Sequence, residues 1–281
     1  MAASTRGMAA LRGQRAVCAG PSEKVFNLTV RELAVDLGMS TTFNAWTFDG
    51  RLPGPTLEVC VGDRVTINLS NQDTVAHGLD THALTIDARK FGPTSPGTTL
   101  TITGTAGTPG AFMYHCASAS ATDVHIKSGL YGAMIVHRRT PLPPASRELV
   151  VVESAVFGER SADGVIAGTD SSRTLRNDAT FRFFNGRLEH DALLVSAGER
   201  VRVYFVNVGP GVSALHVIGS MLDAVIDGAD TRRNVQTYGV APGSGAIVDF
   251  TIPEPGEFLL VDHGQLGYVP TGLALRFTAN P

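Results

Sequence analysis

A histidine and a cysteine stand side by side in Tyr114-His115-Cys116-Ala117, and another histidine, His125, follows nine positions after the cysteine. The apolar run Gly110-Ala111-Phe112-Met113 before them predicts a β-strand. Neighbouring side chains of a strand point to opposite faces. We therefore expect His115 and Cys116 to serve two different metals, with the thiolate facing the inside of a sandwich and the imidazole its outside.

The first expected metal set combines Cys116 with His77 and His125. One thiolate and two imidazoles are the ligands of a trigonal blue-copper electron-transfer site. Taken pair by pair, the residues would equally fit a buried free cysteine with surface histidines, but the combined loop-strand-loop pattern favours copper. A weak axial methionine usually follows the second histidine closely. Here the position is Leu130, which has no lone pair, so we expect three-coordinate copper with a raised reduction potential.

The second expected set is all imidazole and consists of His82, His115 and His263. His77 and His82 differ by five positions, so in an extended segment they face opposite ways. Three histidines with an open fourth position are typical of a catalytic metal. Asp80 lies two residues before His82 and is placed to hydrogen-bond whatever fills that position and to carry a proton there; alternatively, it caps a turn. The remaining histidines are interpreted as ordinary strand-end, loop or near-core residues, with a place for His216 near the second set left open: His137, His190 and His216.

Composition indicates the kind of scaffold that must position these residues. The chain has 281 residues, of which 43% are hydrophobic and 17% charged, as in a globular protein of two domains. Its 31 glycines and 15 prolines, with short Val, Ile and Thr runs, favour an all-β fold with many turns. A net charge of −3 gives no reason to expect nucleic acid. No apolar run approaches the roughly 18 residues that span a bilayer.

The second half of the chain repeats the first. Phe184-Asn185-Gly186-Arg187 echoes Phe48-Asp49-Gly50-Arg51, and the segment 195–203 echoes 59–67. Likewise the segment 255–263 echoes 109–115 and aligns His263 with His115. Such repeats predict a duplicated fold, namely two tandem Greek-key β-sandwiches. We expect a flexible leader or tail over residues 1–22, a first domain over 23–140, a linker over 141–145 and a second domain over 146–281.

The other two cysteines are expected to stay outside any disulfide framework, because three cysteines do not make one. Cys60 is interpreted as a small hydrophobic residue of a strand, and Cys18 as a residue of the leader without consequence for the fold.

With these residues, the chain resembles the copper-containing nitrite reductases over about residues 25–280. The matching motifs are Pro53-Gly54-Pro55, Gly62-Asp63, His77-x-x-Asp80-x-His82, Tyr114-His115-Cys116-Ala117, His125-x-x-Ser128-Gly129, Gly132-Ala133, His216-Val217-Ile218-Gly219 and Asp262-His263. The resemblance implies a homotrimer of two-cupredoxin-domain subunits that lies outside the cytoplasm, for instance in the periplasm. It further implies a type 1 copper that accepts electrons from a small copper protein or cytochrome c, and a type 2 copper that reduces nitrite to nitric oxide.

Carried over to this sequence, the resemblance assigns type 1 copper to His77, Cys116 and His125. It assigns type 2 copper to His82, His115 and a His263 from the neighbouring subunit, with Asp80 as the active-site acid. Two departures concern Leu130, at the position of the axial methionine, and Met221. The resemblance implies a second proton-donating histidine just after the His-x-Ile-Gly stretch, where Met221 stands and cannot carry a proton. We therefore expect weak or altered nitrite reduction.

Three other functions stay open. A laccase-like two-domain multicopper oxidase would use O₂, but the chain has His115-Cys116-Ala117 and Asp80-x-His82 where a trinuclear cluster needs more histidines. A non-catalytic copper protein could keep the metal sites for electron transfer alone. The same architecture could also act on a related small nitrogen oxide or on hydroxylamine.

Overall fold

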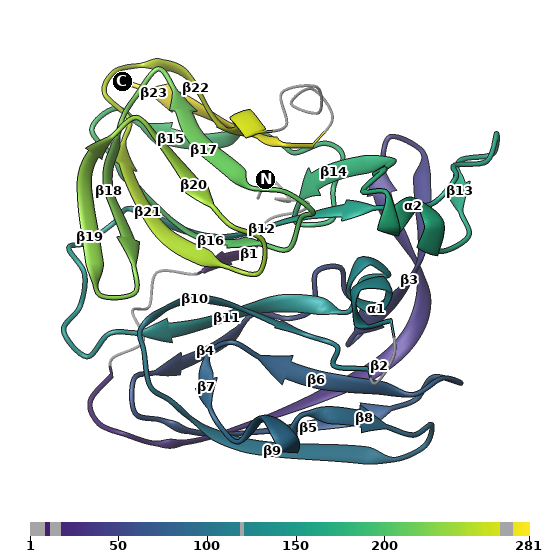
Figure 1. Cartoon of the computed structure of the whole chain (residues 1–281). Coiled ribbons are helices and arrows are strands. Elements are labelled where there is room, and N and C mark those ends of the chain that lie inside the picture. Colours follow the sequence, from purple (N-terminus) through teal and green to yellow (C-terminus); the bar gives the residue numbers. More distant parts are fainter. Residues whose placement is uncertain (1–8, 12–17, 119–120, 265–271) are drawn as a thin grey trace, which may run out of the picture. The chain divides into compact units, whose positions relative to one another are not determined.

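The computed structural model describes residues 9–11, 18–118, 121–264 and 272–281 (Figure 1). The chain forms two compact β-sandwiches, which confirms the predicted all-β class. The first sandwich contains Ala16–Pro141 and Ala155–Thr180, and the second contains Leu142–Ser154 and Phe181–Pro281 together with strand β1. Residues 155–180 therefore belong to the first sandwich, whereas the sequence had placed them in the second domain.

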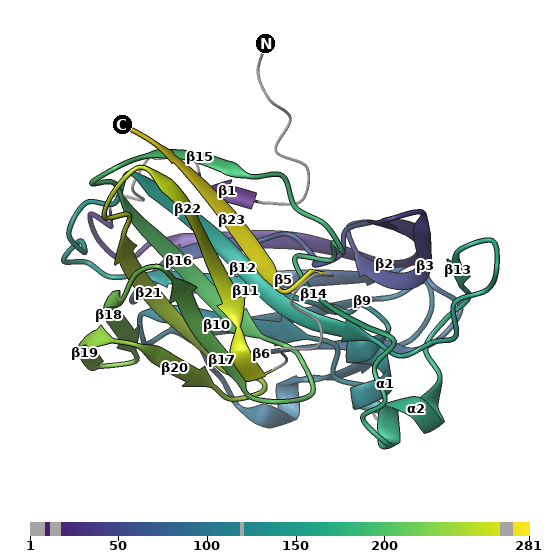
Figure 2. The same cartoon turned by 90° about the horizontal axis from the view of Figure 1, so that it is seen from above.

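Among the described residues, the first sandwich consists of two sheets and three short helices. One sheet has the order β13-β3-β2-β5-β9-β7, with β2 (Glu23–Gly38), β3 (Thr41–Phe48), β5 (Arg64–Asn71), β7 (Leu84–Thr85), β9 (Thr99–Ala106) and β13 (Val165–Ile166). The other has the order β4-β11-β10-β6-β8, with β4 (Leu57–Cys60), β6 (His77–Thr81), β8 (Gly92–Thr94), β10 (Gly110–His115) and β11 (Tyr131–His137). The helices are η1 (Ala88–Lys90), α1 (Thr122–Lys127) and α2 (Ser171–Leu175), and α1 and α2 lie side by side (Figures 1 and 2).

The second sandwich is also built from two sheets. One has the order β1-β12-β16-β21-β18-β19, with β14 paired to β12; its strands are β1 (Ala9–Leu11), β12 (Arg147–Val156), β14 (Phe181–Phe184), β16 (Arg200–Asn207), β18 (Leu222–Asp227), β19 (Asp230–Val235) and β21 (Gly245–Thr251). The other has the order β15-β23-β22-β17-β20, with β15 (Leu193–Ser196), β17 (Ser213–Ile218), β20 (Thr237–Val240), β22 (Gly256–Asp262) and β23 (Ala274–Asn280).

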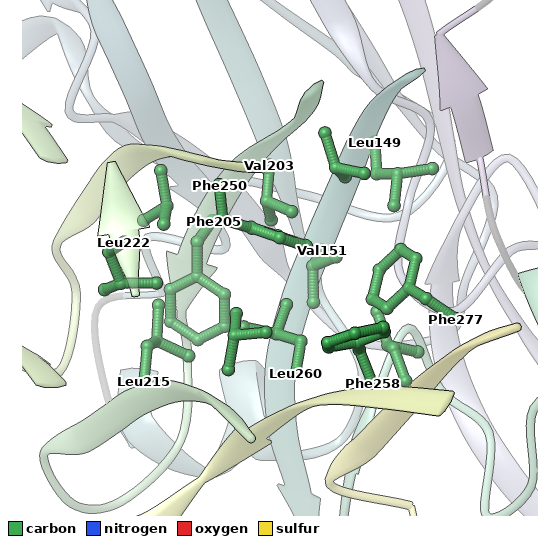
Figure 3. Packing of buried hydrophobic residues seen from close by; sticks show 14 of the residues in the cluster. Leu149, Val151, Val203, Phe205, Leu215, Leu222, Phe250, Phe258, Leu260 and Phe277 are labelled. Carbon is green, nitrogen blue, oxygen red and sulfur yellow. The ribbon is translucent and has the colours of Figure 1, made fainter. Parts of the chain in front are cut away.

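Period-two burial explains why these segments form sandwich strands. In β5, Val65, Ile67 and Leu69 are fully buried while the residues between them are partly exposed. In the second sandwich, Val203 and Phe205 of β16 face Leu260 of β22 across the core (Figure 3). Burying an aliphatic or aromatic side chain of this size contributes about 1.5–3 kcal/mol, so the alternation fixes which face of each strand turns inward.

Equivalent hydrogen bonds occur in the two sandwiches, as expected for a duplicated fold. Asn71 at the end of β5 donates its side-chain amide to the Val75 carbonyl at 2.8 Å, and Asn207 at the end of β16 donates to the Gly211 carbonyl at 2.8 Å. Both asparagines are fully buried. Each of these amides therefore bonds to the carbonyl four positions later and closes the same kind of turn. The turns lie directly before β6 and β17, the strands that carry site residues.

One prediction about the cysteines is wrong. Cys18 and Cys60 form a disulfide with a Cα–Cα distance of 5.7 Å, and Cys116 is the free, buried cysteine of the described residues. The two partners are 42 positions apart, so neither their spacing nor local periodicity revealed that β4 brings them together. Part of the expected flexible leader is therefore held to the rest of the chain, because Cys18 is bonded to Cys60 and β1 pairs with β12. The leader residues 1–8 and 12–17 lie outside the described residues. Within the described ranges, the helices are too short and polar to span a membrane.

Candidate metal centres

A thiol and two imidazoles converge inside the first sandwich. His77 begins β6, Cys116 follows β10 directly and His125 lies in α1. The donor atoms of the three side chains lie within 4.8 Å of one another, with 3.1 Å between the two Nδ1 atoms and 3.5 Å from Cys116 Sγ to His125 Nδ1. One soft sulfur and two imidazole nitrogens at such separations fit a trigonal copper site. The structure therefore brings together the first predicted set.

The Cys116 sulfur is held by main-chain groups. The Gly78 N–H donates to Sγ at 3.3 Å, and a Cβ at Gly78 would lie 2.2 Å from the carbonyl oxygens of Ala117 and Gly92. This position therefore requires glycine. Burial raises the pKa of the Cys116 thiol to about 11, with partial opposition from the main-chain hydrogen bonds. At neutral pH a metal has to displace the thiol proton, as copper does when it binds a cysteine.

Groups around this set fix how it can bind a metal. His77 is fully buried, and burial lowers the pKa of its imidazole, which favours the neutral form. The Trp46 ring packs against both imidazoles, with centroid distances of 4.9 Å to His77 and 4.7 Å to His125. Leu130 is fully buried in the same core and accepts the Cys116 N–H on its carbonyl at 3.0 Å. Its side chain offers a metal no donor atom.

A second set lies where β6 pairs with β10, at the register of His115 with Asp80. The His115 Nδ1–H donates to the Cys116 carbonyl at 2.8 Å, which leaves Nε2 for a metal. That Nε2 lies 3.2 Å from Nε2 of the exposed His82 and 3.9 Å from Oδ2 of Asp80. Burial lowers the pKa of His115. Two imidazoles and one carboxylate thus point to one place, as the sequence predicted for His82, His115 and Asp80.

The third imidazole of the predicted set belongs to the second sandwich. His263 is exposed and follows β22, and its ring lies 5.2 Å from the ring of His216 on β17, measured between centroids. The His216 Nδ1–H donates to the Gln236 carbonyl at 2.8 Å, so Nε2 stays available. Buried Asp262 holds the two histidine-bearing segments together, because its Oδ1 accepts the N–H groups of Ala214 at 2.5 Å and Gly264 at 2.8 Å.

His216 is the site residue that sequence reasoning missed. The expectation that Met221 marks a lost proton donor is not supported by this geometry, because the imidazole beside His263 is His216, five positions earlier. The Met221 side chain is 43% exposed. The strand register also corrects the expected alignment of His263 with His115. His216 pairs with Val261 as Asp80 pairs with His115, so the counterpart of His115 is Val261 and the counterpart of Asp80 is His216.

Several known proteins match this chain in sequence or in structure. The multicopper oxidase family profile matches residues 29–141. The copper-containing nitrite reductase of Alcaligenes xylosoxydans xylosoxydans is 30% identical over 292 residues, which cover 92% of this chain and 88% of that protein. The copper-containing nitrite reductase of Neisseria meningitidis serogroup A is 34% identical over 258 residues; these cover 86% of this chain but 66% of that protein, just under two thirds of its length.

The solved structures agree with the sequence relatives. The copper nitrite reductase from Nitrosomonas europaea superposes with a TM-score of 0.84 at 30% identity, covering 92% of this chain and 94% of that one. A multicopper oxidase structure at 23% identity and a TM-score of 0.78 shares the fold. The chain belongs to the family of copper-containing nitrite reductases.

Proposed function

We propose that this protein reduces nitrite to nitric oxide with one electron from an external donor. The observation that carries the proposal is the adjacency of His115 and Cys116, each of which lies in a different set of metal-binding side chains. Residues His77, Cys116 and His125 would hold type 1 copper. Residues His82, His115 and His263 would hold type 2 copper. One copper of each type per subunit is the stoichiometry that these two sets support.

The two sets are connected through the chain itself. Cys116 and His115 share one peptide unit, and the His115 Nδ1–H bond to the Cys116 carbonyl adds a second connection at 2.8 Å. When bound, the two copper ions supply one-electron redox chemistry at Cys116 and a Lewis-acid centre at the imidazoles. The residues themselves fix the distance between the two sets and keep the electron route short.

Nitrite reduction consumes protons: one nitrite, one electron and two protons give one nitric oxide and one water. Asp80 lies beside the imidazole set, and we assign it the delivery of one proton to an oxygen of nitrite. His216, beside His263, is the second group able to hold a proton there. With His216 in this position, the expected loss of activity through Met221 no longer follows. Leu130 remains a reason to expect a raised type 1 potential.

We further propose a homotrimer in which His263 of one subunit completes the imidazole set of its neighbour. Support comes from the distribution of ligands, because His82 and His115 belong to the first sandwich and His263 to the second. The electron donor would be a small copper protein or cytochrome c, and the protein would work outside the cytoplasm. These parts of the proposal rest on membership of the family.

An anaerobic assay separates the candidate functions. The copper-loaded protein is mixed with a reduced dye and nitrite, and nitric oxide is measured with an electrode beside a parallel measurement of O₂ consumption. We expect one nitric oxide per electron and negligible O₂ uptake. The matched control is His82→Ala, which should lose nitric oxide production while the absorption of the Cys116 copper survives. O₂ consumption without nitric oxide would indicate an oxidase, and neither activity would indicate an electron-transfer protein.

A further inference from the structure

An acidic side chain lies behind the thiol-containing set, on the side of His77 away from the sulfur. Oδ2 of Asp73 accepts the His77 Nε2–H at 3.2 Å. The Asp73 side chain is 6% exposed and that of His77 is fully buried, so water screens this contact little. Because Nε2 is occupied in this way, Nδ1 is the nitrogen that His77 presents toward Cys116 and His125.

The turn that carries Asp73 is fixed independently of His77. The buried Asn71 accepts the Asp73 N–H on its side-chain oxygen at 3.0 Å and donates its amide to the carbonyls of Val75 at 2.8 Å and Thr94 at 2.9 Å. The Thr74 N–H donates to Asp73 Oδ1 at 2.5 Å. The carboxylate is therefore preorganised, with one oxygen anchored to its own turn and the other aimed at the imidazole.

The second sandwich shows that the fold does not need this carboxylate. Its turn is built in the same way: Asn207 accepts the Gly209 N–H on its side-chain oxygen at 2.8 Å and donates to the carbonyls of Gly211 and Val240 at 2.8 Å each. Gly209 thus stands where the first sandwich has Asp73. The asparagine belongs to the architecture of both turns, whereas the carboxylate occurs in the sandwich that has the thiol and imidazole set.

We propose that Asp73 is a positioning residue of the electron-accepting copper, which holds His77 with Nδ1 toward the metal and adds a fixed negative charge that favours Cu(II) over Cu(I). This inference rests on the proposed type 1 copper at His77, Cys116 and His125. Outer-shell carboxylates raise the basicity of the imidazole that they contact. The effect of Asp73 opposes that of Leu130, whose lack of a donor atom favours Cu(I). The two side chains together set the potential at which the copper gives up its electron.

The test uses the copper-loaded full chain and compares Asp73→Asn with wild type. Asparagine keeps an oxygen that can accept the Nε2–H but removes the charge. Changes in such partners typically alter metal affinity by about 10- to 100-fold. We expect the Cu(I)/Cu(II) ratio at a fixed applied potential to rise about tenfold, which corresponds to a shift of about 59 mV to higher potential for one electron. A redox titration followed at the thiolate-to-copper absorption band measures it.

The matched control is Asp123→Asn, which removes the same charge two residues before His125. The Asp123 side chain is 63% exposed and pairs with Lys127 at 2.8 Å. We expect less than a twofold change in the Cu(I)/Cu(II) ratio. An equal shift in both variants would overturn the proposal, because bulk charge would then explain the result.

A second variant, Asp73→Gly, copies the residue that the second sandwich carries at this turn. It should fold, shift the ratio in the same direction as Asp73→Asn, and broaden the absorption band because His77 loses its orienting partner. A normal band with an unchanged potential in both Asp73 variants would refute the role of Asp73 alone. Absence of the band in the wild-type protein would refute the type 1 site itself and the proposal with it.

Discussion

The set of His77, Cys116 and His125 in the first sandwich has a structural counterpart in the second, where an equivalent stretch of backbone carries different side chains. In the first, the Gly78 N–H donates to Cys116 Sγ. In the second, the N–H of Ala214 donates to Oδ1 of Asp262, at the equivalent register of β17 with β22. The main-chain donor is thus a property of the fold. The side chain that accepts this hydrogen bond differs between the two sandwiches: a thiol at Cys116 and a carboxylate oxygen at Asp262.

The neighbouring side chains in the second sandwich carry oxygen atoms, which are harder donors toward a metal than imidazole or thiolate. Ser213 stands at the position of His77 and donates its hydroxyl to Oε2 of Glu153 at 2.7 Å. Glu153 is 1% exposed, and burial together with the nearby Asp262 raises its pKa to about 8. In the second sandwich a hydroxyl, that of Ser213, thus stands at the position of the His77 imidazole, and the carboxyl group of Asp262 stands at the position of the Cys116 thiol. The two sandwiches thus share this part of the backbone, and in the second the side chains of Glu153, Ser213 and Asp262 lie between β12, β17 and β22.

The largest expected effect concerns His216, the register counterpart of Asp80. Replacing His216 with Asn keeps a similar volume but removes the ability to transfer a proton near neutral pH. General acid catalysis contributes about 10²- to 10⁴-fold, so kcat for nitrite should fall by that factor with copper content unchanged. Stopped-flow or electrode measurements of nitric oxide release provide the number. A variant with wild-type kcat would show that His216 only packs against His263.

Met221→His is the matched control for His216→Asn. It places a histidine at the position where the sequence analysis had expected the second proton donor. Because His216 already provides an imidazole beside His263, we expect less than a twofold gain in nitrite turnover. A gain of tenfold or more would restore the interpretation that Met221 replaces a missing proton donor.

Asp262→Ala tests whether the carboxyl group of Asp262 clamps the segments of the second sandwich together. The variant leaves the N–H groups of the half-buried Ala214 and the exposed Gly264 without their acceptor. Water can replace the acceptor at Gly264, so the free energy of unfolding of the copper-free protein should fall by about 1–3 kcal/mol in a urea titration, mainly through Ala214. In the loaded protein, type 2 copper should be lost before type 1 copper. Unchanged stability would mean that the two segments are held by other contacts.

A smaller, pH-dependent effect is expected at Asp63, whose repeat counterpart is Glu199. Burial raises the pKa of Asp63, but hydrogen bonds from the N–H groups of Cys60 and Ser22 and from the Ser22 hydroxyl outweigh it, so the pKa lies below its ordinary value. A lowered folded-state pKa stabilises the protein above the unfolded value, and this stability is lost as the pH falls through the folded value. Asp63→Asn should therefore cost about 1–3 kcal/mol at pH 7. Urea titrations should show this cost shrinking below about pH 4; a cost independent of pH would exclude the ionised carboxylate as its source.

The smallest expected effect is at Leu130. Leu273 is its counterpart, and both leucines are fully buried with their carbonyls accepting the N–H of Cys116 and Asp262. Leu130→Met adds a weak thioether donor, which stabilises Cu(II) and should lower the type 1 potential by some tens of millivolts. Redox titration of the blue absorption measures the shift. A rise in potential would show that the sulfur does not reach the metal.

Periodic features of this molecule were predictable from the sequence and non-local ones were not. The short Val, Ile and Thr runs between many glycines and prolines, together with the repeats around Gly62 and Gly198, predicted two β-sandwiches. The odd separation of His77 and His82 predicted two faces, because side chains in a strand alternate. The Cys18–Cys60 disulfide and the ring contact of His216 with His263 depend on how distant strands pair. No spacing along the chain encodes that pairing, so both were missed.

The division of two neighbouring side chains between two metals is tested most directly with His115→Ala. Copper content per chain is measured together with the absorption of the thiolate-bound copper and nitrite turnover. We predict loss of one copper and of turnover, while the blue absorption persists because Cys116, His77 and His125 are intact. Loss of the absorption with turnover retained would contradict the assignment of His115 and Cys116 to separate centres.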